Sequence, residues 1–132
     1  MGPSNSMGWE LGVKALGSND YIIFRGSNNG TNTQEVRSTS VAISTNTWYH
    51  LAVTYNKGTV RFYFNGVAKG SASISGSVAA DLFASTAPLR IGKTDASSTT
   101  QEFTGLVDEL RLSQTIRYTT GFTPSTTEFA ED

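Results

Sequence analysis

The chain has 132 residues, which suits one domain with a single core, and it contains no cysteine, which excludes disulfides and thiolate metal sites. Ten Lys and Arg balance eleven Asp and Glu without a basic cluster, so we expect no nucleic-acid partner. No apolar run approaches the about 18 residues of a membrane span, so we expect no membrane insertion.

The composition favours an all-β fold. The chain has 16 Ser, 18 Thr and 13 Gly beside many β-branched and aromatic residues, which are the residues of strands and turns. Short apolar or alternating segments recur between turn residues, as in a sandwich or barrel. The predicted strands are residues 9–14, 21–25, 34–38, 48–56, 59–64, 67–73, 88–92 and 104–113. Residues 78–85 and 114–119 have the pattern of one helical turn each.

The chain divides into a short leader and one domain. Residues 1–8 have the composition of a tag remnant or a disordered leader, with neither the charged nor the apolar part of a signal peptide. We expect residues 9–132 to form a single domain, because no internal repeat or linker-like composition interrupts them.

The stretch 58–70, GTVRFYFNGVAKG, predicts a β-hairpin with its turn at Asn65-Gly66. Alternation places Val60 and Phe62 on the face that packs against an opposite sheet, and Arg61 and Tyr63 on the other face. Tyr63 then has two interpretations, a residue packed under a second layer or a platform on which a sugar ring stacks. Arg61 and Tyr63 are candidate ligand-binding residues, together with three loop amides, Asn28, Asn29 and Asn32.

Asp108 stands out in the stretch TGLVDELRLS, where a period of two places it on one face with Leu106, Leu110 and Leu112. A carboxylate on an apolar face needs a partner. One interpretation is a buried structural Asp that accepts backbone N–H bonds or pairs with an Arg. The other is a Ca²⁺ ligand, with Asp95 as a second carboxylate and the loop asparagines adding oxygens, although the spacing has no EF-hand pattern.

Catalytic residues are scarce. The lone His50 lies between Tyr49 and Leu51 within a predicted strand, where a packed or half-exposed imidazole is the ordinary case. The adjacent acids Asp108 and Glu109 point to opposite faces of their predicted strand, so they cannot converge on a glycosidic bond. We therefore expect no enzymatic activity.

The stretches TWYHLAVTYNKGTVRFYFNGVAKGSASI, APLRIGK and FTGLVDELRLSQTIRYTTGFTPSTTEF, in this order, resemble the concanavalin A-like jelly rolls of the laminin G-like group. The resemblance covers residues 9–129, and its last part is similar to versions in bacteriophage virion and tail proteins. It implies an antiparallel jelly-roll β-sandwich, shortened here because complete members begin with another pair of strands. It also implies a rim calcium site in some members, for which Asp95 and Asp108 are the counterparts in this chain.

The resemblance implies a recognition module on an extracellular or virion surface that binds a glycan or cell-surface polysaccharide. The alternatives are an assembly module of a virion that binds another protein, and a glycoside hydrolase relative without the catalytic acids. Strands absent from the sandwich would leave sheet edges unpaired, so we expect a homo-oligomer formed through exposed edges, or coverage of the gap by residues near Trp9.

Overall fold

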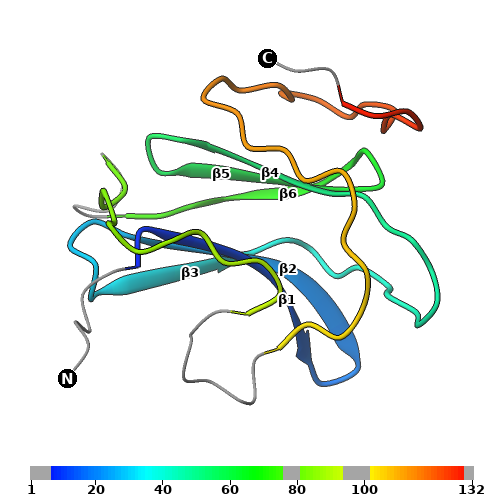
Figure 1. Cartoon of the computed structure of the whole chain (residues 1–132), viewed down its shortest axis with the longest axis horizontal. Coiled ribbons are helices and arrows are strands. Elements are labelled where there is room, and N and C mark those ends of the chain that lie inside the picture. The colour runs from blue at the N-terminus through cyan, green and yellow to red at the C-terminus, as the bar shows by residue number, and fades with distance from the viewer. Residues whose placement is uncertain (1–6, 76–80, 94–101, 130–132) are drawn as a thin grey trace.

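The computed structural model describes residues 7–75, 81–93 and 102–129, and within them six β-strands form two antiparallel sheets (Figure 1). The first sheet has the order β1-β2-β3 and the second the order β4-β5-β6. The strands are β1 (Trp9–Leu16), β2 (Asn19–Ser27), β3 (Thr33–Arg37), β4 (Leu51–Asn56), β5 (Thr59–Phe64) and β6 (Val67–Ser73). The all-β sandwich expected from the sequence is confirmed.

Tight turns join the strands of the second sheet. The β4–β5 turn is Lys57-Gly58 and the β5–β6 turn is Asn65-Gly66, and all four residues have positive φ. Two successive left-handed residues give a turn whose twist matches that of the flanking strands. The predicted hairpin at Asn65-Gly66 is therefore confirmed.

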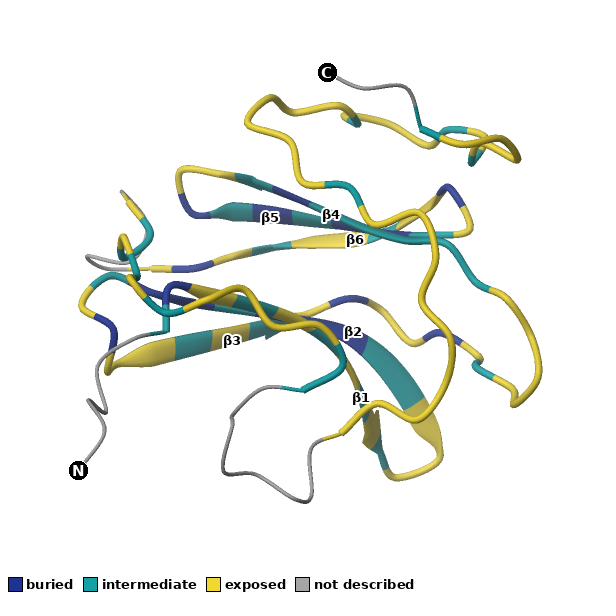
Figure 2. Ribbon diagram, viewed as in Figure 1, coloured by how far each residue is buried: buried dark blue, intermediate teal, exposed yellow. Residues whose placement is uncertain are grey.

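The core lies between the two sheets. Ile22 and Phe24 of β2 face Val60 and Phe62 of β5, and each of these side chains is at most 5% exposed. Figure 2 shows the buried positions concentrated on the strands, while the chain after β6 is mostly exposed. The alternation in β5 thus buries the residues that the sequence assigned to the inner face.

Two predicted strands are wrong: residues 88–92 and 104–113 form no strand. Near them, the described residues form one bridge, between Lys93 and Glu102. A strand requires a neighbouring strand for its N–H and C=O groups, and neither segment lies in a ladder. Within 104–113, Glu109 also has a φ of 52°, which interrupts an extended conformation. The helical turn predicted at 114–119 is also wrong, as is the described part, 81–85, of the turn predicted at 78–85, while residues 78–80 lie outside the described residues.

The C-terminal segment crosses the outer side of the second sheet (Figure 1). The Phe122 N–H donates to the Gly66 carbonyl at 2.9 Å, and the Tyr63 hydroxyl donates to the Tyr118 carbonyl at 3.1 Å. The segment therefore forms a partial third layer over the β5–β6 hairpin.

Candidate binding surface

Tyr63 is covered by the C-terminal segment. Its side chain is 1% exposed and lies beside the rings of Tyr118 and Phe122, with centroid distances of 6.0 Å and 5.5 Å. Tyr118 and Phe122 in turn stack on each other at 3.6 Å. Of the two interpretations of Tyr63, the structure shows the packed one, because no ring face is left on which a sugar could stack.

A β-bulge lies next to Tyr63. Arg61 pairs with Ser71 and Tyr63 with Ala68, so two β6 residues lie opposite Phe62. The bulge includes Gly70, whose φ is 93°, and the Lys69 carbonyl accepts a bond from the Thr39 N–H at 2.8 Å. A bulge bends the strand and redirects its side chains, which makes room at this point of the sheet surface.

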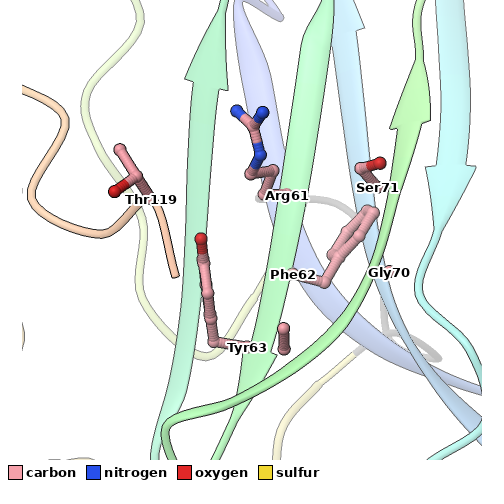
Figure 3. A pocket seen from close by; sticks show the side chains of 7 residues that line it. Arg61, Phe62, Tyr63, Gly70, Ser71 and Thr119 are labelled. Carbon is pink, nitrogen blue, oxygen red and sulfur yellow. The ribbon is translucent and has the colours of Figure 1, made fainter. Parts of the chain in front are cut away.

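An open pocket of about 240 Å³ lies at this bulge (Figure 3). Figure 3 shows Arg61 and Tyr63 projecting in the same direction from β5, with Thr119 of the C-terminal segment nearby. Its wall is mixed, with apolar atoms beside the guanidinium and hydroxyl groups. The lining residues are Arg61, Phe62, Tyr63, Ala68, Gly70, Ser71 and Thr119.

Arg61 is the charged group of this pocket. Its side chain is partly buried, and within the described parts of the chain no carboxylate forms an ion pair with it. Arg25 provides the contrast, because it contacts Glu10 and Glu35 at 2.9 Å and 2.7 Å. The Arg61 guanidinium therefore keeps its donors for water or for a bound anion.

The loop asparagines do not join this pocket. The Asn29 side-chain oxygen accepts bonds from the Thr31 and Asn32 N–H groups at 3.0 Å and 2.8 Å, which stabilises the β2–β3 loop. Asn28 and Asn32 belong to the same loop, on the other sheet. Among the described contacts, none links this loop to Arg61, so a ligand-binding role for the asparagines stays a separate prediction.

Asp108 does not lie on a buried apolar face, so that prediction is wrong. It is exposed, as are its predicted neighbours Leu106, Leu110 and Leu112 at 77%, 55% and 56%. Its carboxylate accepts a bond from the adjacent Glu109 N–H at 2.9 Å. The error follows from the missing strand, because a period of two places residues on one face only in an extended ladder.

The described residues add no support to the prediction that Asp95 and Asp108 bind Ca²⁺. Asp95 lies outside the described residues, and the described ones contain no group of three or more His, Cys, Asp or Glu side chains that could hold a metal. Ca²⁺ takes six to eight oxygen ligands, so Asp108 alone does not make a site. Calcium binding stays a prediction on Asp95 and Asp108.

Replacing Asp108 with alanine is therefore expected to change the free energy of unfolding by less than about 0.5 kcal/mol, the usual range for an exposed residue. Urea unfolding of the variant and the parent protein measures this change. A loss above about 2 kcal/mol would show that Asp108 is buried against a partner after all.

His50 is packed, as the sequence predicted, although it precedes β4 and is not part of it. Its ring meets Phe122 edge-on at 5.4 Å, and its Nδ1 is buried with no partner among the described residues. Burial lowers the pKa of His50 below its usual value. Two hydrogen bonds join the His50 backbone to Asn65, so this packed residue supports the end of the β5–β6 hairpin.

Sequence reasoning missed an ion-pair network on the outer side of the first sheet. Arg25 lies between Glu10 and Glu35, and Lys14 contacts Glu35 at 3.0 Å. Burial opposes ionisation of Glu35, but hydrogen bonds from Lys14 and Arg25 outweigh it and lower the pKa of the carboxyl. Alternation could have placed these residues on one face, but their contacts depend on the register of three strands.

Comparison with known proteins settles the family. A laminin G-type family model, described as the concanavalin A-like lectin/glucanases superfamily, matches residues 1–118. The chain belongs to this superfamily. Curated proteins and solved structures gave no match. The superfamily fits a carbohydrate-binding or protein-binding module.

Within the described residues, no helix is long and apolar enough to span a bilayer.

Proposed function

We propose that the chain is a non-enzymatic recognition module that binds a carboxylated glycan at the pocket beside Arg61. The carrying observation is the partly buried guanidinium of Arg61 at a bulge, which forms no ion pair with any described residue and shares the pocket with the hydroxyl groups of Ser71 and Thr119. A guanidinium binds a carboxylate through two parallel hydrogen bonds, and hydroxyl groups exchange hydrogen bonds with sugar hydroxyls. The mixed wall of the pocket suits a sugar acid.

The pocket size favours recognition of one sugar unit. Its volume of about 240 Å³ is smaller than the roughly 300–1,000 Å³ of pockets that hold drug-sized ligands. It is open at the surface of the second sheet, so the rest of a polysaccharide can continue into solvent. This favours a terminal or side-branch acidic sugar of a cell-surface polysaccharide, as a phage tail protein or an adhesin would meet it.

The module is proposed to be non-enzymatic because of the ion pairs that Glu10 and Glu35 form. Glycosidases need one carboxyl with a raised pKa as the acid beside an ionised one. Glu10 and Glu35 share a sheet face, but Arg25 lies between them and the pKa of Glu35 is lowered. Both side chains form ion pairs with Arg25, and the lowered pKa of Glu35 is the opposite of what a proton donor needs.

Protein binding within a larger assembly is the second candidate, favoured by the exposed apolar side chains of residues 103–112. Phe103 is 60% exposed, Leu106 77% and Val107 53%. Exposed apolar side chains that gather in one segment mark a contact with another protein more often than with a sugar. In this case the segment, and not the Arg61 pocket, carries the interaction.

A glycan array tests the glycan proposal, with the parent protein, Arg61→Gln and the matched control Arg37→Gln. Arg37 lies on β3 of the other sheet and contacts Tyr21, so its loss removes the same charge without touching the pocket. We expect binding to carboxylated glycans, weakened about ten- to hundredfold by Arg61→Gln, because hydrogen bonds to charged groups contribute about 1.5–3 kcal/mol. The control should bind like the parent.

Three results would overturn the proposal: no binding to any acidic glycan, equal binding by Arg61→Gln, or equal losses in both variants. Repeating the array with chelator and with calcium separates binding at Arg61 from a calcium-dependent lectin site at Asp95 and Asp108, because only the latter would disappear in chelator.

A further inference from the structure

β1 forms one edge of the first sheet. Within the described residues β1 pairs only with β2, so the backbone N–H and C=O groups on its other side lie in no ladder. An unpaired strand edge is a template for another strand. The outer edge of β1 is therefore a candidate interaction surface, away from the pocket on the second sheet.

The side chains of β1 add a second observation. Leu11 and Val13 lie opposite Phe24 and Ile22, so they share the inner face of the sheet with the core. Yet Leu11 is 40% exposed and Val13 46%, and Trp9 on the same face is 39% exposed. The core is thus incompletely covered along this edge.

The charges of β1 select one partner and one register. An antiparallel pair of two β1 strands centred on Gly12 places Glu10 opposite Lys14 of the second copy, and Leu11 opposite its Val13. Centring the pair on Glu10 or Lys14 would place like charges opposite each other, and centring it on Leu11 or Val13 would leave the charges without opposite partners. The strand is self-complementary in a single register.

Glu10 and Lys14 already form ion pairs within one copy, and both would also face the second copy across the twofold axis at Gly12. Glu10 and Lys14 lie on the outer face, where Glu10 uses Oε2 for Arg25 and Lys14 contacts Glu35. Within the described residues β3, β4 and β6 are also edge strands, but β3 and β6 lie against each other, and β4 (Leu51–Asn56) carries no charged residue and so specifies no register.

We propose that β1 pairs antiparallel with β1 of a second copy about Gly12, joining two three-stranded sheets into one continuous sheet. The apolar side chains Trp9, Leu11 and Val13 of both copies then form one strip along the core face. This interface deepens the expectation of self-association through sheet edges and leaves the Arg61 pocket free on each copy.

Sedimentation equilibrium of Glu10→Lys, of Lys14→Glu and of their equimolar mixture tests the register. Each variant alone would place like charges opposite each other at both symmetric positions, so we expect dimerisation at least tenfold weaker than in the parent. In the mixture both cross-strand pairs become opposite in charge, so heterodimers should form with near-parental affinity. Monomers in the mixture, or dimers in each variant alone, would overturn the register.

Hydrogen exchange of the unmodified chain keeps the proposal testable if a variant does not fold. Amides of β1 should become more protected as protein concentration rises, while β4 amides should not change. A strict monomer at millimolar concentration, or concentration-dependent protection confined to β4 or to residues 103–112, would contradict pairing through β1.

Discussion

Replacing Phe62 with alanine is expected to lower the free energy of unfolding by about 3–5 kcal/mol. Phe62 is fully buried on β5 and packs in the core that both sheets share. Its removal leaves a cavity that the three-stranded sheets on either side can fill only by moving. Because a domain of this size is stable by about 5–15 kcal/mol, the variant should unfold at much lower urea concentration.

The matched control is Val67→Ala, because Val67 lies in the same sheet but is 59% exposed. It should cost less than about 0.5 kcal/mol. Urea unfolding followed by circular dichroism measures both variants. A loss below about 1 kcal/mol for Phe62→Ala would show that the two sheets do not enclose a common core around this ring.

Replacing Gly66 with alanine is expected to cost about 2–3 kcal/mol for two physical reasons. Gly66 has a φ of 76°, a conformation that costs a residue with a Cβ about 1–2 kcal/mol. An added Cβ would also overlap the Phe122 carbonyl, so the C-terminal segment must move and lose the bond from the Phe122 N–H to Gly66. That hydrogen bond contributes about another 1 kcal/mol.

Gly17→Ala separates the two reasons. Gly17 has a similar φ of 64°, but a Cβ there would meet nothing within 4 Å. We expect only the conformational cost in this control, and unchanged near-ultraviolet circular dichroism from the Tyr63 and Tyr118 rings. Equal losses in both variants, with the aromatic signal intact, would mean that the C-terminal segment does not lie on the hairpin.

The first six strands could be predicted from the sequence because their signals are local. Alternation in 59–64 and the Asn65-Gly66 turn specify a hairpin without reference to the rest of the chain. The segments 88–92 and 104–113 have comparable apolar patterns, but a strand also needs a partner, and periodicity carries no information on whether one is present. The burial predicted for Asp108 was wrong because it assumed a strand at residues 104–113.

Only part of the candidate pocket could be predicted from the sequence. The outward direction of Arg61 followed from the period of two, but the finding that no described carboxylate pairs with it depends on the whole fold. The bulge had one local signal, because a glycine inside a strand, Gly70 here, often marks such a site. Coverage of Tyr63 by Tyr118, 55 residues later, had none.

The central claim is that the pocket beside Arg61 binds an acidic sugar, and amide chemical-shift mapping during titration with glucuronic acid tests it most directly. We expect saturable shifts at Arg61, Ser71 and Thr119 in the parent protein, absent in Arg61→Gln and retained in Arg37→Gln. Shifts confined to the 28–32 loop or to the ion pairs of the first sheet, with the pocket amides unchanged at saturating ligand, would contradict the claim.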